Sequence, residues 1–457
     1  MTNRGSLVVV ANRLPVERAT RAGLRWQRSP GGLVSAMEPV VSKRGALWIG
    51  WDGSAGRAPA PAKLGRMRLR AVGLSRTQVE GYYQGFSNGT LWPLYHDAVW
   101  PPEIHRKWWG PYRDVNLKFA SAAARHAPRH ARVWVHDYHL QLVPWMLRER
   151  RPDLTIGLFL HIPFPPEELF SWLPWRTPIL KGLMGADVLG FQTESSSSNF
   201  ARVAKRFLGC SGTERELEFA GRRVRLLPCP ISIDTERFME LAASPDTRRK
   251  AAEIREKLSG RKIILSVDRL DYTKGIPARL RAFEELLKER RVSAEDVVHV
   301  QVAVPSRESM PGYLAVRREV EEIVGRINGE YSHPGMVPVH YYRRSFSAED
   351  LAAWYVAADV MVVTPLRDGM NLVAKEYVAC RTNHDGVLVL SEFAGAAREL
   401  RRALLVNPRD IEAVKSALVQ AIRMPARDAS MRMAILRTQV KRHTVADWSG
   451  AFLDELS

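Results

Sequence analysis

The sequence predicts an α/β protein made of two Rossmann-like, doubly wound domains that face each other across a cleft. A chain of 457 residues is too long for a single hydrophobic core of ordinary size. It fits two domains of about 200 residues each. Short apolar runs alternate with helical stretches throughout, which is typical of parallel sheets. A polar connector near residues 232–260 divides these runs into two series. We therefore expect domains at 1–235 and 236–430, with a C-terminal helix over 431–457 packing back on the first domain.

The first series of apolar runs predicts six strands, each short and rich in β-branched residues. They are Leu7–Ala11, Ala46–Gly50, Arg132–His136, Thr155–Leu160, Val188–Gln192 and Val224–Pro228. Between them the spacing of apolar residues predicts helices over Leu140–Arg150 and Ser195–Leu208.

The second series predicts six more strands. They are Lys262–Asp268, Val297–Val304, Val337–Tyr342, Val360–Thr364, Val387–Ser391 and Leu404–Val406. The segment Ala426–Leu456 is predicted to be helical. Folds of this kind bind ligands at the carboxyl ends of their strands, so polar residues that follow a strand directly are the first to consider.

The composition is that of a globular protein, with 46% hydrophobic and 26% charged residues. The three cysteines lack the spacing of a zinc site or a disulfide framework, which favours a reducing compartment. No run of about 18 apolar residues appears, and the first residues lack the pattern of a signal peptide. We expect a cytoplasmic protein without a membrane partner.

The net charge of +19 is the unusual feature of the composition. Nucleic acids and small polyanionic substrates are the two classes of partner that such a charge suggests. The basic residues are scattered along the chain and form no basic-aromatic module or tail, so we expect no nucleic-acid partner.

A loop with two cations follows the strand that begins at Lys262. Arg269 and Lys274 lie five residues apart, and Gly275 closes the loop before a predicted helix. A guanidinium offers a planar fork to phosphate oxygens and an ammonium a mobile point charge. Both could hold a diphosphate and stabilise the charge that builds on a departing nucleotide. The alternative is a surface loop in which Asp268 and Asp271 pair with these cations.

A second polar loop follows the apolar run at Val360. Asp368 and Gly369 would lie at the strand end, and a helix would begin near Asn371. Helix N-termini favour phosphate, an aspartate can accept hydrogen bonds from sugar hydroxyls, and Glu376 is placed to bind a ribose. In the alternative interpretation Asp368 only caps the helix and Glu376 is solvated.

Together these two loops resemble the donor half of a retaining glycosyltransferase of GT-B architecture. Their residue patterns resemble those of trehalose-6-phosphate synthases, which form retaining glycosyltransferase family 20. Similar motifs extend over almost the whole chain. They include Ala11-Asn-Arg-Leu-Pro, Ser29-Pro-Gly-Gly-Leu, Leu47-Trp-Ile-Gly-Trp, Phe86-Ser-Asn-Gly-Thr-Leu-Trp-Pro, Val135-His-Asp-Tyr-His-Leu, Leu160-His-Ile-Pro-Phe-Pro, Gly325-Arg-Ile-Asn-Gly and Ser391-Glu-Phe-Ala-Gly-Ala.

The resemblance implies a donor site. Arg269 and Lys274 match the pair that holds the donor diphosphate, and His161 matches the histidine at the C6 hydroxyl of the donor sugar. Asp368 matches the carboxylate on the transferred glucose, and Glu376 the ribose ligand. The positions that match backbone contacts to the donor are Gly32, Gly369, Met370, Asn371, Leu372 and Val373.

The resemblance also implies an acceptor site. Arg13 and Arg307 match two arginines that grip the 6-phosphate of glucose 6-phosphate, and Asp137 matches a carboxylate near the reacting oxygen. The aromatic and hydroxyl contacts around that sugar match Trp51, Tyr83 and Trp92. Judged without the resemblance, both tryptophans are more typical of a core.

The implied reaction moves glucose from a nucleoside diphosphate glucose to glucose 6-phosphate with retention at the anomeric carbon. Catalytic roles fall to Arg269, Lys274, Asp137, His161 and Asp368. We expect no metal and no cofactor, because Arg and Lys supply the positive charge. His136 and His139 flank Asp137, but no third ligand lies nearby in the sequence to complete a metal site.

Other functions stay open at this point. A pseudo-glycosyltransferase that couples cyclitols, and an enzyme that transfers glucose to glycerol 3-phosphate, would keep the same fold. A non-catalytic regulatory or nucleic-acid-binding scaffold belongs to a different class. Glu308-Ser-Met-Pro-Gly-Tyr departs from the run that usually follows the arginine at Arg307. The donor base could be uracil, guanine or adenine, and the sequence is compatible with a homo-oligomer.

Overall fold

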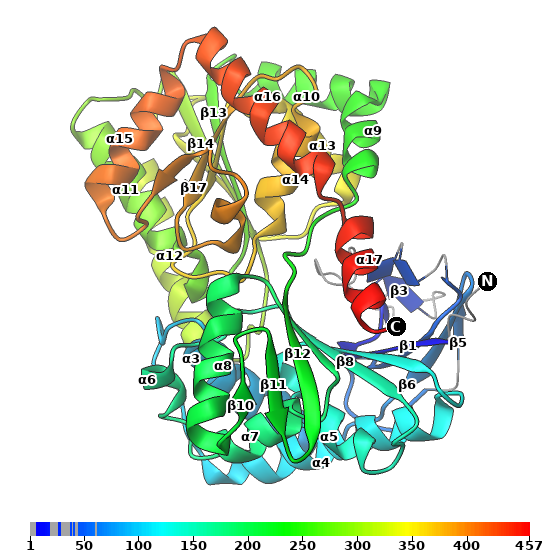
Figure 1. Ribbon diagram of the computed structural model, residues 1–457. Coiled ribbons are helices and arrows are strands. Elements are labelled where there is room, and N and C mark those ends of the chain that lie inside the picture. The colour runs from blue at the N-terminus through cyan, green and yellow to red at the C-terminus, as the bar shows by residue number, and fades with distance from the viewer. Residues whose placement is uncertain (1–5, 19–25, 29–36, 39, 42–43, 60–61) are drawn as a thin grey trace. The chain divides into compact units, whose positions relative to one another are not determined.

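The computed structural model describes residues 6–18, 26–28, 37–38, 40–41, 44–59 and 62–457, which form two compact units (Figure 1). Unit 1 comprises Met1–Ile231 and Val445–Ser457, and unit 2 comprises Ser232–Thr444. Each unit is built on a largely parallel sheet with helices packed on it, so the α/β fold class predicted from the alternating runs is confirmed.

Unit 1 contains, within its described residues, a sheet of ten strands in the order β10-β11-β12-β9-β8-β7-β1-β4-β6-β5. The strands from β12 to β6 run parallel, and the two edges turn antiparallel. Their bounds are β1 Leu7–Arg13, β4 Leu47–Trp51, β5 Ala62–Leu64, β6 Met67–Ala71, β7 Arg132–His136, β8 Thr155–Leu160, β9 Val188–Phe191, β10 Ser211–Gly212, β11 Glu216–Phe219 and β12 Arg222–Pro228. A separate antiparallel pair joins β2 (Val16–Arg18) to β3 (Trp26–Arg28).

Unit 2 contains a fully parallel sheet in the order β15-β14-β13-β16-β17-β18. Its strands are β13 Lys262–Arg269, β14 Val297–Val304, β15 Val339–Tyr342, β16 Val360–Val363, β17 Val387–Ser391 and β18 Leu404–Val406. The central strands are buried along most of their length because helices cover both faces, which explains their continuous apolar runs.

The helices of unit 2 lie on both sides of this sheet, with α11, α12 and α15 on one face and α13, α14 and α16 on the opposite face (Figure 1). On that second face α9 and α10 pack on the outer side, against α13 and α14. Their bounds are α9 Thr235–Ala243, α10 Pro245–Lys257, η3 Tyr272–Lys274, α11 Ile276–Lys288, α12 Pro311–Tyr331, α13 Ala348–Ala357, α14 Leu372–Cys380, η4 Gly395–Arg398, α15 Ile411–Ile422 and α16 Ala426–Arg442.

The helices of unit 1 include a long π-helix, η1. The bounds are α2 Arg76–Gln78, η1 Val79–Leu91, α3 Trp92–Tyr95, α4 Arg106–His126, η2 Tyr138–Leu140, α5 Val143–Arg148, α6 Glu167–Phe170, α7 Arg176–Leu183, α8 Glu194–Leu208 and α17 Val445–Glu455. In η1 a Cβ on Gly85 would lie 2.5 Å from Trp108 of α4, so only glycine permits this close approach. Gly85 therefore lets the Trp108 ring pack directly against the backbone of η1.

Two predicted helices differ from the observed ones. The helix expected over Leu140–Arg150 is the short η2 followed by α5, because Pro144 lies in the first turn of α5, where a proline is tolerated. The helical segment expected over Ala426–Leu456 is two helices, α16 in unit 2 and α17 in unit 1. The chain returns to unit 1 at Val445, after α16 has ended.

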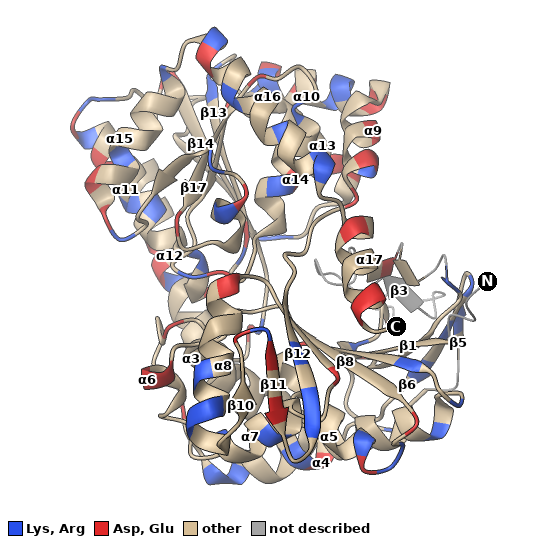
Figure 2. Cartoon of the chain, viewed as in Figure 1, with Lys and Arg blue, Asp and Glu red and all other residues tan. Residues whose placement is uncertain are grey.

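The basic residues and the three cysteines are dispersed over both units. Lysine and arginine are spread over the helices and loops of both units (Figure 2). The three cysteines are buried and unbonded to one another. Among the described residues, no helix combines the length and the apolar character that crossing a membrane requires.

Candidate active site

The predicted site residues follow strands on either side of the point where the strand order of each sheet reverses. In unit 2 this point lies between β13 and β16, and Arg269 ends β13 while Thr364 follows β16. In unit 1 it lies between β1 and β7, where Arg13 ends β1 and Asp137 follows β7. Loops diverge at such a point, so the doubly wound topology predicts a ligand-binding crevice there in each unit.

The loop after β13 turns sharply through η3 into α11. Gly275 has φ +66°, and a Cβ there would lie 2.4 Å from the carbonyl oxygen of Thr364. The Thr273 carbonyl oxygen accepts the N–H of Leu366, two residues after Thr364, at 2.8 Å. The two loops that carry the predicted donor residues are therefore held side by side.

A buried arginine, Arg279 of α11, fixes the loop after β13 through hydrogen bonds. The Arg279 side chain is fully buried, and its guanidinium donates to the Lys274 carbonyl at 3.0 Å and to the Thr364 hydroxyl at 2.9 Å. It also pairs with Asp268 at 2.7 Å. Asp268 therefore pairs with Arg279. It does not pair with Arg269 or Lys274, as the surface-loop alternative supposed.

The predicted cations lie close to two aspartates. The Lys274 ammonium contacts Asp368 Oδ2 at 2.5 Å, with both side chains largely buried. The Arg269 guanidinium lies 3.5 Å from the buried Asp271, yet 39% of the Arg269 side chain is exposed. Lys274 and Asp368 are thus brought together, and Arg269 keeps a surface on which a ligand can bind.

The loop after β16 leads into α14, as predicted. Asn371 is the N-cap, with φ +81°, and its side chain accepts from the N–H of Ala374 at 3.2 Å. Its amide also donates to Asp368 Oδ2 at 3.2 Å. Asp368 is therefore not the cap that the alternative interpretation made it. The first-turn N–H groups of Leu372 and Val373 have no partner within an α-helix.

Further along α14, Glu376 is only partly exposed. Tyr355 of α13 donates to Glu376 Oε2 at 2.8 Å. Burial raises the pKa of the Glu376 carboxyl, although the Tyr355 hydrogen bond and the charge of Arg237 oppose this. The alternative of a solvated helix residue is therefore wrong. The preceding Lys375 is buried and pairs with Glu399 at 2.8 Å.

Arg307 belongs to the same unit as the donor loops. It follows β14 with φ +48°, and its side chain is 6% exposed. Its guanidinium contacts the Tyr313 hydroxyl and lies 3.8 Å from Asp271 Oδ2. The departure Glu308-Ser-Met-Pro-Gly-Tyr thus ends in a residue that contacts Arg307.

In unit 1 the structure brings together Arg13, Trp51 and Tyr83. The Arg13 guanidinium lies 5.0 Å from the Trp51 ring and pairs with Glu17 at 3.0 Å. The Trp51 and Tyr83 rings meet edge to face at 5.4 Å, and the Trp51 indole donates to the Ser54 carbonyl. Trp51 is only 2% exposed, so little of its surface is open to a ligand here. Trp92, 5% exposed, contacts Tyr138.

Asp137 and His161 are joined through the main chain. Asp137 has φ +74°, and its Oδ1 accepts the N–H of His161 at 3.1 Å. The His161 Nε2 lies 3.0 Å from Nδ1 of the buried His136. Burial lowers the pKa of His161 to about 3, so its imidazole is neutral at physiological pH. Gly32 lies outside the described residues.

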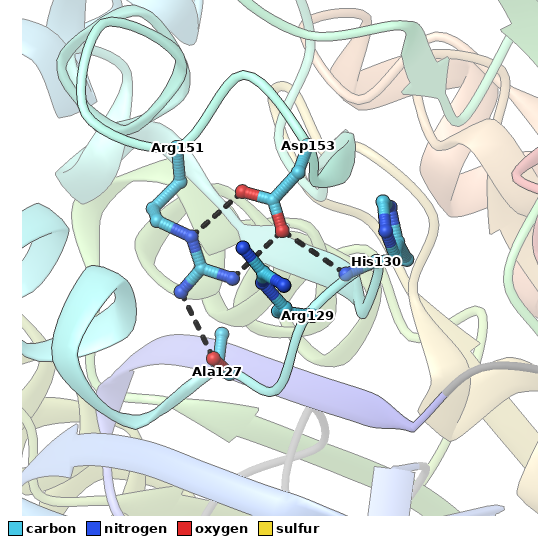
Figure 3. A pocket seen from close by; sticks show the side chains of 5 residues that line it. All are labelled: Ala127, Arg129, His130, Arg151 and Asp153. Carbon is cyan, nitrogen blue, oxygen red and sulfur yellow. Dashed lines mark hydrogen bonds and ion pairs between the residues drawn. The ribbon is translucent and has the colours of Figure 1, made fainter.

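Two other features lie away from these residues. A surface hollow in unit 1 is lined by Ala127, Arg129, His130, Arg151 and Asp153 (Figure 3). Its residues precede β7 and β8, so they lie at the amino edge of the sheet, opposite the predicted site. Among the described residues, one acidic group, formed by Glu285, Glu289 and Glu412, has metal-ligand spacing. The Lys415 ammonium contacts all three carboxylates.

Sequence reasoning missed several residues that shape the site. Arg279 and Tyr355 each hold a predicted residue or its loop in place. The sequence indicates His136 only as a metal-ligand candidate, Asp271 only as an ordinary ion-pair partner and Tyr313 only as part of an altered loop. In the structure His136 contacts His161. The placement of these residues depends on contacts between strands and helices far apart in sequence, which residue spacing does not reveal.

Comparison with protein families matches the model of "Glycosyltransferase family 20" to residues 5–457. A trehalose-6-phosphate synthase of Mycolicibacterium smegmatis is 50% identical over 469 residues, which cover 100% of this chain and 93% of the relative.

Two solved structures are similar over nearly their full length. An alpha,alpha-trehalose-phosphate synthase (UDP-forming) from Burkholderia xenovorans, in complex with glucose-6-phosphate, has a TM-score of 0.92 at 34% identity and covers 99% of this chain and 100% of its own. A structure described as trehalose-6-phosphate from E. coli bound with UDP-2-fluoro glucose has a TM-score of 0.90 at 34% identity and covers 99% of each chain.

Proposed function

This chain belongs to glycosyltransferase family 20, and we propose that it transfers glucose from a nucleoside diphosphate glucose to glucose 6-phosphate, giving trehalose 6-phosphate and a nucleoside diphosphate. The observation that carries the proposal is the arrangement around the switch point of unit 2. There Arg269, the Lys274–Asp368 pair and the N-terminus of α14 converge from two adjoining loops.

The donor diphosphate binds to Arg269, Lys274 and the N-terminus of α14. An ammonium has three N–H donors, so Lys274 can keep Asp368 and still donate to phosphate oxygens. The N–H groups of Leu372 and Val373 add the positive end of the helix dipole. These groups stabilise the negative charge that develops on the leaving diphosphate.

The nucleoside and the sugar are held by the surrounding polar groups. Glu376, fixed by Tyr355, binds the ribose hydroxyls. Asp368 accepts hydrogen bonds from the transferred glucose, supported by the backbone of Gly369, Met370 and Asn371. Because His161 is neutral, it contacts the C6 hydroxyl as a hydrogen-bond partner and adds no charge. Gly32 completes the donor contacts.

The acceptor phosphate is bound by Arg13 and Arg307, whose guanidinium groups can each form two parallel hydrogen bonds with it. Trp51, Tyr83 and Trp92 are the aromatic contacts of the acceptor sugar in this proposal, and the burial of both tryptophans limits each to a contact over a small part of its ring. Asp137 accepts a hydrogen bond from an acceptor hydroxyl close to the reacting oxygen. Its Oδ1 also accepts the N–H of His161, which fixes the position of His161.

Glucose is transferred with retention. The acceptor's anomeric hydroxyl attacks the anomeric carbon from the face that the diphosphate leaves. The C–O bond to the diphosphate breaks as the new C–O bond forms, and the proton passes to a departing phosphate oxygen. The paired carboxylates that retaining hydrolases use are not required in this route.

The reaction needs neither a metal ion nor a cofactor, because Arg269 and Lys274 supply the positive charge that a divalent ion would otherwise bring. The protein works in the cytoplasm and binds its two sugar substrates without a nucleic acid or a membrane. Assembly into a homo-oligomer is compatible with this activity.

A donor and acceptor screen tests the proposal. Nucleotide release is measured with UDP-, GDP- and ADP-glucose, each with glucose 6-phosphate, glycerol 3-phosphate or no acceptor, and with or without EDTA. We expect release that depends on glucose 6-phosphate and persists in EDTA, with UDP-glucose the first donor to test because the B. xenovorans relative is UDP-forming. Nucleotide release that requires glycerol 3-phosphate would mean that glycerol 3-phosphate, and not glucose 6-phosphate, is the acceptor. No release with any pair, from folded protein, would overturn the proposal.

A further inference from the structure

We infer that Asp271 and Tyr313 are positioning residues that hold Arg269 and Arg307 together, and so link the binding of the two phosphate-bearing substrates. This inference rests on the proposed function, in which Arg269 binds the donor diphosphate and Arg307 the acceptor phosphate. Neither Asp271 nor Tyr313 needs to contact a substrate in this role.

The two oxygens of the Asp271 carboxylate have different tasks. Oδ1 accepts from the N–H of Thr273 at 3.0 Å and from its hydroxyl at 2.9 Å, which fixes the loop that leads to Lys274. Oδ2 faces both arginines, 3.5 Å from Arg269 and 3.8 Å from Arg307. One side chain therefore determines the loop conformation and the place of both guanidinium groups.

Tyr313 joins this cluster from another element. It lies in the first turn of α12, and its hydroxyl donates to Asp271 Oδ2 at 3.3 Å while accepting from the Arg307 guanidinium. Its ring lies 5.4 Å from the Arg307 Cζ and packs on Tyr272. Arg307 is thus held through its charge, its N–H groups and the aromatic face.

The charge of Asp271 explains why two cations can lie so close together. Burial alone would raise the pKa of this carboxyl, but Arg269, Arg307 and Lys274 outweigh burial and lower it. Asp271 is therefore ionised and reduces the repulsion between the two guanidinium groups.

This arrangement predicts different effects for two conservative substitutions. Tyr313→Phe removes the hydroxyl that contacts Arg307 and leaves the ring, so it should weaken glucose 6-phosphate binding more than nucleotide binding. Asp271→Asn keeps the acceptor for Thr273 but turns an amide toward the arginines, so it should weaken both ligands. A lost hydrogen bond to a charged group corresponds to about 10-fold to 100-fold in affinity.

The experiment measures kcat and KM for both substrates, together with calorimetric titrations of UDP and of glucose 6-phosphate, for the wild type and both variants. Tyr331→Phe, at the far end of the same helix, is the matched control and should behave as the wild type. Thermal unfolding establishes that each variant is folded. A merely structural role would lower the folded fraction and kcat without separating the two KM values.

The outcomes separate this inference from the proposed function. A wild type that binds both ligands but turns over no donor–acceptor pair would refute the proposed function, and the titrations would still test the positioning. Folded Tyr313→Phe and Asp271→Asn with wild-type affinities for both ligands would overturn the inference. If Tyr313→Phe failed to fold, Asp271→Asn alone would decide. No wild-type affinity for glucose 6-phosphate would overturn both.

Discussion

The Arg269 side chain both contacts the protein and presents part of its surface to solvent. Its guanidinium lies beside Asp271, yet 39% of the side chain is exposed. We expect Arg269→Ala to lower kcat by about 100-fold to 1,000-fold, the usual cost of losing one donor that stabilises transition-state charge. The thermal unfolding temperature should fall only modestly, because the Arg269 side chain is partly exposed and Asp271 still lies beside Arg307.

The matched control for this prediction is Arg318→Ala, an exposed arginine on α12 of the same unit. It removes the same charge far from the donor loops, so kcat should stay near the wild-type value. Equal activity of the two variants would show that Arg269 takes no part in the reaction.

Buried histidines predict a loss of stability in acid. His299 on β14 bonds to the Ser266 hydroxyl, and burial, with the nearby charge of Arg279, lowers its pKa to about 3. Below the unfolded-state pKa of about 6.5, the unfolded chain takes up a proton that the folded chain refuses, so stability falls as the pH falls. Between pH 7.5 and pH 5 this amounts to about 2 kcal/mol for one histidine.

Urea denaturation of His299→Gln at these two pH values measures the effect. The glutamine keeps a polar group near Ser266 but does not titrate, so its free energy of unfolding should fall by about 2 kcal/mol less than that of the wild type. His333→Gln, at an exposed position of unit 2, should leave the pH dependence as it is. The same pH dependence in all three proteins would contradict the assignment to His299.

At the scale of single residues, the sequence predicts where the site residues lie better than it predicts which residues they contact. Arg269 and Lys274 follow a strand where parallel topology puts ligand groups, and this could be predicted because strand ends are marked by the end of an apolar run. Their partners could not. Lys274 pairs with Asp368, ninety-four residues away, because β13 and β16 are neighbours in the sheet and not in the sequence.

Among the elements, the π-helix η1 depends on its glycines. A Cβ on Gly85 would lie 2.5 Å from the ring of Trp108 in α4, so the helix or the tryptophan must move. Overpacking of this kind costs about 1–3 kcal/mol. We therefore expect Gly85→Ala to destabilise the protein by that amount and to weaken the acceptor contacts, since η1 also carries Tyr83.

Gly325→Ala provides the comparison. Gly325 lies at an exposed position of α12, where nothing surrounds the added Cβ within 4 Å. Alanine in a helix interior is more stable than glycine by about 0.5–1 kcal/mol, so this variant should unfold at a higher urea concentration. If Gly85→Ala matched Gly325→Ala, close packing of η1 on α4 would not be what stabilises this region.

The elements also show which sequence signals are informative. Strands such as β7, β8, β14 and β17 begin and end as predicted, because buried parallel strands are continuous apolar runs with clear limits. The π-helix could not be predicted, since its periodicity is neither that of a strand nor that of an α-helix. The antiparallel edge strands β10 and β11 were also missed, because they are short and polar.

On the scale of the whole molecule, unit 1 is completed by the last residues of the chain. Phe452 of α17 stacks on Trp134 at 4.9 Å, and Trp448 lies 5.1 Å from both Trp134 and Phe159. Gly190 leaves room for Phe452, since a Cβ there would approach its ring to 2.7 Å. The sequence predicts a C-terminal helix over 431–457 that packs back on the first domain, but it does not mark Val445 as the start of that return, because neither glycine nor proline stands at the break after α16.

This dependence predicts that a change at the C-terminus destabilises strands formed by residues far earlier in the chain. Phe452 is fully buried, and replacing such a ring with alanine costs about 3–5 kcal/mol. In Phe452→Ala, hydrogen exchange measured by mass spectrometry should accelerate in β7, β8 and β9 of unit 1 and stay unchanged in β13 and β14 of unit 2. Asp454→Ala, at an exposed position of the same helix, should exchange like the wild type. Faster exchange confined to unit 2 would mean that α17 contributes to the stability of the other unit, whereas uniform acceleration would mean that the two units unfold as one.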